Sequence, residues 1–428
     1  MLATTLLLLV GLLALSVPVA AVMGVLGLAL NQFYASMPLH RAMGEIIWNS
    51  SSEYILIAIP LFVMLGEILL RSGIAERVYN GIAQWLSWLS GGLMHANIGS
   101  CAMFAATSGS SVATAATIGT VAIPEIKKYN YNESLFLGTI AAGGTLGILI
   151  PPSINFILYG LLTNTSVPRL YLAGFLPGFL LASLFMVIVL VACLLDRKKG
   201  GTPIATSWSQ RFRMLPVLLP PLFIFVVVVG SIYAGVATPT EAASLGVIAA
   251  LILAVWERRV SLSMLRGVAE GTMRMTAMIM LIIMAAQFLN FVLAAIGLTE
   301  GFGKFIEGLG LGKYGTMLFI VAFYLVLGCF METISMMILT TPFIAPIVFG
   351  LGWDPIWWGI VLTILIEAAL ITPPVGLNLY VVQGMRGRGS INEVIRGSLP
   401  FVFAMLVLIG LLMAAPGIAL WLPRYVMG

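Results

Sequence analysis

Charged residues are scarce in this chain. Asp, Glu, Lys and Arg make up only 9% of its 428 residues, whereas a soluble domain carries about 25%. Cysteine and histidine are also few: the three cysteines form no CxxC or CxxxC pair, and His40 and His95 lie far apart. These absences argue against a soluble enzyme, a disulfide framework, a zinc site and a Ser-His-Asp triad.

Apolar residues are correspondingly abundant. They make up 61% of the chain, and the mean hydropathy is +1.09. This composition excludes a disordered chain and a nucleic-acid-binding domain, because the net charge of +5 comes from basic residues in short loops between apolar runs. It predicts an all-α polytopic membrane protein that forms a single integral membrane domain over residues 1–428.

Long apolar runs predict nine membrane crossings. The amino-terminal run lacks the basic n-region and the short apolar core of a signal peptide, so we expect it to be retained as the first crossing. The crossings are expected at residues 2–31, 53–72, 133–162, 167–195, 212–236, 239–256, 275–297, 355–384 and 397–423. Two further runs, 91–124 and 313–349, are rich in small and polar residues and broken near the middle. This pattern indicates two re-entrant helical hairpins.

The basic residues predict the orientation of the chain. With nine crossings and a cytoplasmic amino terminus, 16 of the 21 Lys and Arg residues lie on the cytoplasmic side and 5 on the opposite side. That asymmetry follows the positive-inside rule. Treating the second hairpin as a crossing would change the split to 13 against 8, which fits the rule less well.

Four landmarks recur in the two halves of the chain at an offset of 222 to 224 residues. They are Pro124 and Pro346, Pro151-Pro152 and Pro373-Pro374, Pro177 and Pro400, and Glu76 and Glu300. The pattern predicts repeat 1 at 53–195 and repeat 2 at 275–423, joined by a region with two spans at 196–274. Each repeat contains one hairpin and one helix broken by its proline pair. Because five crossings separate the two starts, the repeats are inverted, which is typical of secondary transporters with a midplane binding site.

The hairpin and the helix breaks carry the candidate chemistry. The first hairpin contains Thr107-Ser108-Gly109-Ser110-Ser111, and an Asn follows each proline pair, at Asn155 and Asn378. A break within the membrane frees backbone carbonyls and amides, which coordinate Na⁺ or attract carboxylates. Close helix packing by small residues is the alternative for the serines, and a simple kink is the alternative for the prolines.

Three acidic residues fall within apolar runs, namely Glu67, Glu332 and Glu367. A buried acid in a membrane costs about 2.5–3.5 kcal/mol or more, so each is expected to have a partner. Na⁺ coordination, proton coupling, a helix cap and a packing contact all remain open. No Lys or Arg within the membrane offers an obvious pairing, which favours a cation or a backbone partner. In the TPTE run, Thr238 or Thr240 is expected to cap the following helix.

With these residues identified, the sequence closely resembles the large membrane subunit of tripartite ATP-independent periplasmic (TRAP) transporters, the DctM-like family. The matching motifs cover essentially the whole chain: SGSS, ILIPPS, GVATPTEAA, METIS…TTPFIAP, GLGWDP and, most specifically, EAALITPPVGLNLYV. The resemblance implies Na⁺-coupled import of an organic acid anion, such as a C4-dicarboxylate, sialic acid or another carboxylate, and no enzymatic activity. It also implies the bacterial inner membrane, with the carboxyl terminus in the periplasm, and two partners: a small DctQ-like membrane subunit and a periplasmic DctP-like solute-binding protein.

The resemblance further implies an elevator mechanism, in which the hairpins and broken helices move against a scaffold formed by the other spans and the small subunit. The implied Na⁺ ligands are Ser108, Gly109, Ser110, Ser111, Pro151, Ser153, Asn155, Glu332, Thr333, Thr340, Thr372, Pro373, Val375, Gly376 and Asn378. The implied substrate contacts are Ser110, Ser111, Pro152, Asn155, Thr340, Thr341, Pro374 and Asn378. Two positions depart from the family pattern: Glu332 replaces the usual Asp, and Ala369 replaces a frequent Gly.

Other classes of function remain as alternatives. A standalone divalent-anion/Na⁺ symporter with related hairpins would transport free substrate without a binding protein. An intramembrane enzyme would need a nucleophile with a base, and neither histidine lies in a broken-helix segment. A channel would not require an inverted repeat of broken helices.

Overall fold

The chain is helical throughout the part that the structure describes. A computed structural model describes residues 1–15, 17–202, 207–328 and 331–428, apart from the side chains of residues 2, 3, 6, 14 and 106–108. Within these ranges the regular elements are all helices. Seven of them are long and apolar enough to cross a membrane, or up to nine if each of two bent pairs is one span. The prediction of an all-α polytopic membrane protein is confirmed.

Five predicted crossings coincide with helices of spanning length. These are Tyr54–Arg71, which includes α4 (Ala58–Arg71), α10 (Val167–Leu195), Trp208–Tyr233, which includes α11 (Trp208–Met214) and α12 (Leu219–Tyr233), α13 (Pro239–Trp256) and α14 (Leu262–Ala295). The last begins 13 residues before the predicted start at 275, because Ser261 caps its amino terminus by accepting from the Met264 amide. Thr238 likewise caps α13, within a capping box with Glu241, as expected.

The first and last predicted crossings each divide into two helices. Residues 2–31 form α1 (Leu2–Ala14) and α2 (Val19–Tyr34), and Pro18 precedes α2. The crossing at 397–423 is covered by α20 (Ile391–Ala414) and α21 (Gly417–Met427), with Pro416 directly before the second helix. Proline has no N–H to continue a helix and clashes with the preceding turn, so a single proline ends the helix at both places.

The predicted hairpins are two pairs of helices. The first consists of α6 (Leu93–Ser108) and α7 (Ser111–Lys128), and the second of α16 (Gly312–Leu327) and α17 (Thr333–Gly350). Gly109 separates the first pair in a left-handed conformation with φ of +60°, which glycine adopts without a steric penalty. By length and composition α17 alone could cross a membrane, and the re-entrant path of both pairs remains a prediction.

The proline pairs interrupt two further helices. The first break separates α8 (Glu133–Leu149) from α9 (Ile154–Thr163), with a bend of 45°. The second separates α18 (Pro355–Leu370) from α19 (Leu377–Arg386). These bounds lie within two residues of the ranges expected from the sequence.

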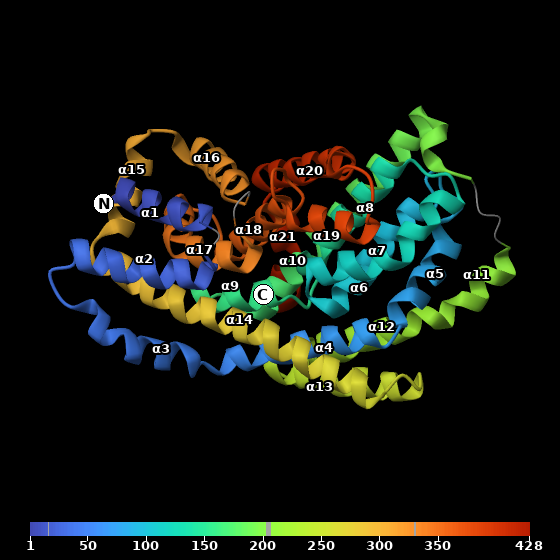
Figure 1. The fold of residues 1–428 in the computed structure, drawn as a ribbon, viewed down its shortest axis with the longest axis horizontal. Helices are drawn as coiled ribbons and strands as arrows, with labels where there is room; N and C mark the ends of the chain where they lie inside the picture. The colour runs from blue at the N-terminus through green and yellow to red at the C-terminus, as the bar shows by residue number, and fades with distance from the viewer. Residues whose placement is uncertain (16, 203–206, 329–330) are drawn as a thin grey trace.

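The helices form two layers (Figure 1). One layer runs along the lower edge of the view and contains α2, α3 (Met43–Ser51), α4 and α11 to α14. The other contains the hairpins and broken helices, with α5 (Ile74–Leu86), α10, α15 (Leu298–Gly308), α20 and α21. The layers meet where α4 packs on α6 and α9 and where α14 packs on α17. We call them the outer layer and the hairpin layer.

Contacts within the hairpin layer are reciprocal between the two halves of the chain. The second piece of each broken helix packs on the second hairpin helix of the other half, so α9 contacts α17 and α19 contacts α7. In the same way, α8 contacts α20 and α18 contacts α10. This exchange intertwines the two proposed repeats.

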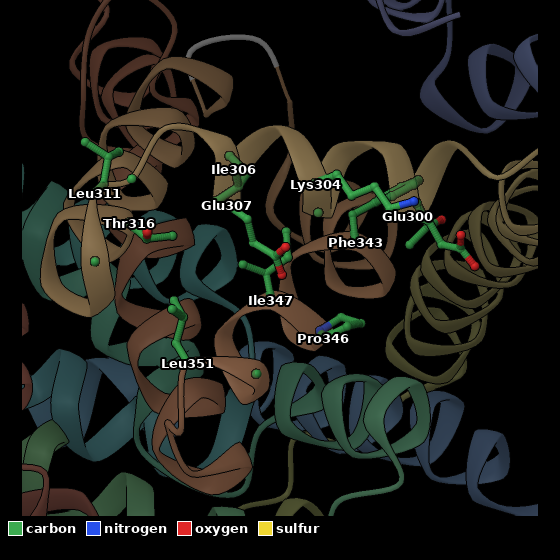
Figure 2. Close-up of a pocket in the computed structure, with 15 residues that line it drawn as sticks. Glu300, Lys304, Ile306, Glu307, Leu311, Thr316, Phe343, Pro346, Ile347 and Leu351 are labelled. Carbon is green, nitrogen blue, oxygen red and sulfur yellow. The ribbon is translucent and has the colours of Figure 1, made fainter.

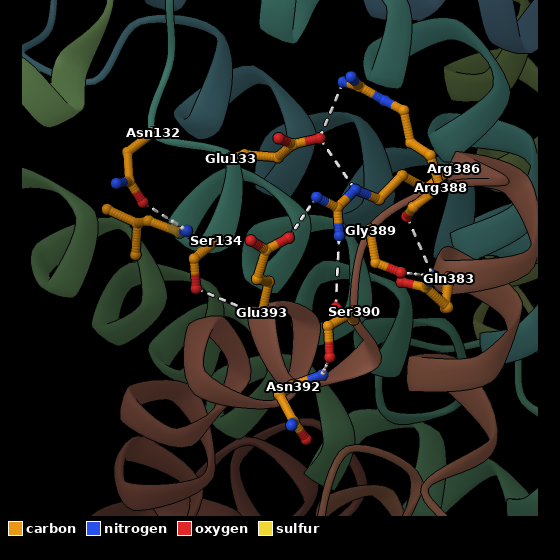
Figure 3. Close-up of polar contacts among 11 residues, drawn as sticks. Asn132, Glu133, Ser134, Gln383, Arg386, Arg388, Gly389, Ser390, Asn392 and Glu393 are labelled. Atoms are coloured by element: carbon orange, nitrogen blue, oxygen red, sulfur yellow. Dashed lines mark hydrogen bonds and ion pairs between the residues drawn. The ribbon is translucent and has the colours of Figure 1, made fainter.

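An ion-pair cluster joins the first broken helix to the second (Figure 3). The Arg386 side chain, only 3% exposed, donates from Nε to Glu133 Oε1 at 2.9 Å and also pairs with Glu393. Arg388 reaches the same Glu133 oxygen at 2.9 Å. Nearby, Gly138 of α8 and Gly397 of α20 lie so close that a Cβ on either would overlap with the backbone of the opposite helix. The two halves are therefore fixed together at this end of the layer.

Ala369, which replaces a Gly that is frequent in the resembled family, lies against the end of α16. A Cβ on Gly328 would overlap with the Cβ of Ala369 on α18. We expect Gly328→Ala to destabilise the purified protein by about 1–3 kcal/mol, the usual cost of overpacking. The melting temperature in detergent measures this change.

The same contact predicts a partial rescue. Ala369→Gly introduced together with Gly328→Ala removes the overlapping methyl group, although the Cα of Ala369 and the carbonyl of Tyr324 remain close to the new Cβ. Gly301→Ala is the control, because a Cβ there meets nothing within 4 Å. A double variant no more stable than Gly328→Ala would show that the two positions do not clash.

Candidate functional site

A cavity of about 250 Å³ lies at the boundary of the two layers. The hairpin layer contributes the first hairpin tip, the first helix break, the start of α17 and the end of α18, and the outer layer contributes α4 and α14. The lining residues are Val63, Gly66, Glu67, Leu70, Gly109, Ser110, Ser111, Val112, Ala113, Ile148, Ile154, Asn155, Met275, Met278, Ile279, Glu332, Thr333, Ile334 and Leu370. We call it the tip cavity.

The tip of the first hairpin begins with Ser110 at the amino terminus of α7. Ser110 Oγ accepts from the Ala113 amide at 3.4 Å, and Ser111 Oγ donates to the carbonyl of Thr145 on α8 at 3.4 Å. A Cβ on Gly147 would lie 2.9 Å from the Ser110 carbonyl oxygen, so glycine in α8 allows the tip to approach. The first turn of α7 therefore borders the tip cavity, and the amino terminus of a helix attracts anions.

The first break supplies buried polar atoms without partners. Ser153 and Asn155 are at most 1% exposed. Among the described residues, neither Ser153 Oγ nor Asn155 Nδ2 has a hydrogen-bond partner. Leaving such a group buried and unpaired costs about 1–3 kcal/mol. Unpaired groups beside a cavity are therefore candidates for contact with a ligand.

The second hairpin places Glu332 at the amino-terminal cap of α17. Its carboxylate accepts from the amides of Ile334 and Ser335 at 3.2 and 3.1 Å, and from the hydroxyls of Ser335 and Thr333 at 3.1 and 3.2 Å. Of the roles left open by the sequence, the helix cap is the one visible in these contacts. A role in binding Na⁺ stays a prediction.

Of the residues at the second break, the described lining of the tip cavity includes Leu370, the last residue of α18. Asn378 is fully buried and donates from Nδ2 to the carbonyl of Ala141 on α8 at 3.1 Å, while its Oδ1 accepts from no described residue. Ala141 precedes Ile148 of the cavity lining by seven residues, or about 10 Å along a helix. The two breaks therefore define two polar regions that are separated along the axis of α8.

The tip cavity thus collects only part of the site predicted from the sequence. Gly109, Ser110, Ser111, Asn155, Glu332 and Thr333 line it. Thr340 and Thr341 do not: their hydroxyls donate to the carbonyls of Met336 and Met337 within α17. The other predicted residues outside the lining are Pro151, Pro152, Ser153, Thr372, Pro373, Pro374, Val375, Gly376 and Asn378. The side chain of Ser108 lies outside the described part of the chain.

Glu67 and the α14 side chains Met275, Met278 and Ile279 were missed as cavity residues. The expectation that no arginine pairs with a buried acid is wrong for Glu67, since Arg71 donates from Nε to Glu67 Oε2 at 3.0 Å. The spacing of four residues on one helix is the sequence signal for this pair. Its position opposite the first hairpin tip depends on the packing of the two layers.

Glu367 is more completely enclosed. It is 0% exposed, and within the described structure no side chain donates a hydrogen bond to either carboxylate oxygen. The side chain lies beside the backbone of Ile148 and Leu149 in α8. Because an ionised carboxylate is costly to bury without a partner, we expect Glu367 to be a neutral acid.

A larger hollow of about 660 Å³ lies between α15, α16 and α17 (Figure 2). Glu300, Lys304 and Glu307 of α15 line it opposite apolar residues of α17 such as Phe343 and Ile347. Its described lining contains none of the residues predicted for the site. The tip cavity is therefore the better candidate for a ligand site despite its smaller volume.

The chain is similar to known transport proteins over nearly its whole length. The family model described as "Tripartite ATP-independent periplasmic transporter, DctM component" matches residues 6–418. The C4-dicarboxylate TRAP transporter large permease protein DctM of Vibrio cholerae is 31% identical and covers 98% of this chain and 97% of its own length. The ectoine TRAP transporter large permease protein TeaC of Halomonas elongata is 30% identical over 86% of each chain.

The fold is also similar to a solved structure. The YdaH transporter of Alcanivorax borkumensis, described as having an unusual topology, superposes with a TM-score of 0.63. The match covers 98% of this chain and 99% of the other, and at 15% identity it supports the fold alone. Together with the family match, these findings identify a transporter subunit and not an enzyme. The chain belongs to the DctM family, the large membrane subunits of TRAP transporters.

Proposed function

We propose that this chain is the translocation subunit of a binding-protein-dependent secondary transporter that imports an organic acid anion together with Na⁺. The observation that carries this proposal is the tip cavity, where a helix amino terminus and the unpaired Asn155 amide meet at a broken helix. Amides and helix amino termini suit a carboxylate. Hydroxyls and the carbonyls freed at the first break suit a hard cation such as Na⁺.

A second cation region is proposed at the other break. Asn378 Oδ1 is buried and unpaired among the described residues, and Nδ2 of the same side chain is fixed by Ala141. An acceptor held in this way is suited to coordinate a cation. With the first break, this arrangement gives one proposed Na⁺ region for each half of the chain.

The distribution of polar groups around the cavity supports an elevator movement. The hairpin layer contributes both hairpin tips and the first break, whereas the outer layer contributes mainly apolar side chains, with Glu67 as the exception. A ligand held by the hairpin layer would move with that layer. In this proposal the outer layer, with a small membrane subunit, is the fixed scaffold.

Two partner chains and an orientation belong to the same proposal. The family name describes a tripartite system, and we propose a small DctQ-like membrane subunit and a periplasmic DctP-like binding protein as the other parts. The relatives named above carry the names of a C4-dicarboxylate and of ectoine, both carboxylate compounds. We place the chain in the bacterial inner membrane with a cytoplasmic amino terminus and a periplasmic carboxyl terminus, because of its asymmetric basic residues.

Reconstitution separates this proposal from a standalone symporter. In liposomes that contain this chain and the small subunit, we expect Na⁺-driven uptake only when the binding protein is added. Uptake of free substrate by this chain alone would instead favour the standalone symporter.

Bulky apolar residues at the first hairpin tip and at the second break test the Na⁺ sites. We expect Ser110→Leu and Asn378→Leu to reduce Na⁺-dependent uptake in proteoliposomes at least tenfold (about 1.4 kcal/mol or more), because each replaces a polar atom at a proposed site. Ser183→Leu is the matched control: Ser183 is exposed on α10 and its hydroxyl donates only to Phe179 of the same helix. Unchanged Na⁺ dependence in both Ser110→Leu and Asn378→Leu would refute the assignment.

Substitution by glutamine tests whether Glu332 acts as a helix cap and whether Glu367 is a neutral acid. Glu332→Gln removes a carboxylate that accepts several bonds, so we expect a loss of about 1 kcal/mol of stability and a shifted Na⁺ or pH dependence of uptake. Glu367→Gln retains the shape and neutrality that we expect of the buried acid, so uptake should stay within twofold of the wild type. Uptake is measured across a range of pH. Loss of uptake in Glu367→Gln would contradict the interpretation of Glu367 as a neutral acid.

A further inference from the structure

The tip cavity has one wall that does not belong to the hairpin layer. Val63, Gly66, Glu67 and Leu70 of α4 line it at the spacing of one helix face. Glu67 is therefore the charged group that the outer layer presents to the first hairpin tip. Glu67 and Glu332 are the charged side chains among the described lining residues.

Glu67 is held in position by its neighbours. Arg71 binds Oε2, and the pair lies against Gly267 and Gly271 of α14, one turn apart. A Cβ on Gly267 would collide with the Arg71 guanidinium, and one on Gly271 would collide with the Glu67 carboxyl group. The Glu67 side chain is 22% exposed, and Oε1 accepts no hydrogen bond from any described residue. A fixed carboxylate with a free acceptor thus borders the cavity.

The polar groups around the cavity are divided between its two walls. The hairpin layer supplies donors, which are the Asn155 amide and the first turn of α7. The outer layer supplies the acceptor, Glu67. The carboxylate of Glu332 already accepts hydrogen bonds from the start of α17, and no Lys or Arg of the described chain lines the cavity. An occupant that satisfies both walls must be an acceptor at one end and a donor at the other.

We infer that the substrate is an organic acid with a hydroxyl or a cationic N–H group at the end opposite its carboxylate, and that Glu67 selects it. This inference rests on the proposed function, since it assumes that the tip cavity holds the substrate. With the layers placed as in this structure, the carboxylate lies at the amino terminus of α7, and the donor group binds Glu67 Oε1. A dicarboxylate is disfavoured, because its second carboxylate would face Glu67 across a largely apolar space and like charges repel strongly there.

Four-carbon acids of similar length test the inference directly. The probes are 4-hydroxybutyrate and 4-aminobutyrate, which carry a terminal donor, butyrate, which carries none, and succinate, which carries a second carboxylate. Binding to the purified full-length chain is measured by thermal stabilisation in Na⁺-containing and Na⁺-free buffer. We expect the two donor-bearing acids to bind at least tenfold more tightly than butyrate and succinate. Equal binding of all four acids, or binding of none, would overturn the inference.

Variants assign the preference to Glu67. Glu67→Ala should remove the preference for both donor-bearing acids. Glu67→Gln keeps an acceptor but no charge, so it should retain 4-hydroxybutyrate, weaken 4-aminobutyrate and tolerate succinate better. Glu270→Ala is the matched control, because Glu270 pairs with Arg266 at 2.7 Å at the same spacing but is exposed and lies outside the cavity. A preference unchanged in Glu67→Ala would show that another group selects the substrate.

Ser110→Leu distinguishes a failure of this inference from a failure of the proposed function. If Ser110→Leu abolishes binding of all probes while Glu67→Ala changes nothing, the cavity is the binding site and Glu67 is not selective. If Ser110→Leu leaves binding intact, the proposed site itself is wrong, and the inference fails with it.

Discussion

Backbone amides and carbonyls that are freed inside a membrane need partners, because lipid offers none. The chain interrupts its helices at Gly109, at Pro151-Pro152, around Glu332 and at Pro373-Pro374. Each interruption lies against another helix of the hairpin layer or beside the tip cavity. The need to satisfy these groups accounts for the close packing around α8, where glycines admit the first hairpin tip, and for the cap that Glu332 provides to α17.

The boundary between the layers is the second organising feature. Both hairpin tips reach it, and α4 and α14 close it from the other side with an apolar surface that includes two methionines. Methionine side chains are flexible and fit irregular surfaces, which suits the proposed movement of one layer against the other. The Glu67–Arg71 ion pair is the charged part of this otherwise apolar described surface. The two layers therefore contribute walls of different chemistry to the candidate site.

Much of the architecture was readable from the sequence because its signals are local. Paired prolines end helices wherever they occur, so the broken helices were placed within two residues. The single prolines Pro18 and Pro416 were not recognised as breaks, because one proline can also be accommodated as a kink, as Pro177 is within α10. Hydroxyl groups gave the least reliable signal: Thr340 and Thr341 donate to carbonyls of their own helix, and Thr340 also contacts the Tyr324 hydroxyl of α16, which composition does not reveal.

The position of Glu67 opposite Ser110 could not be predicted, because it depends on how two layers distant in sequence are stacked. The positions of Asn155 at the tip cavity and of Asn378 beside Ala141 also depend on tertiary packing. The repeat predicted that two asparagines would have related roles, but the different surroundings of the two follow from packing. Local patterns thus identified the breaks, and tertiary contacts decide what each break faces.

The contact between Gly138 and Gly397 has a consequence for how such a molecule can diversify. The two helices approach this closely only because neither glycine has a side chain. The ion pairs of Arg386 connect the two halves at a second place. If one half were replaced by that of a distant relative, its surface would therefore not match the surface of the remaining half. The two halves must accumulate changes jointly, so natural variants of this molecule should exchange whole subunits far more readily than half-subunits.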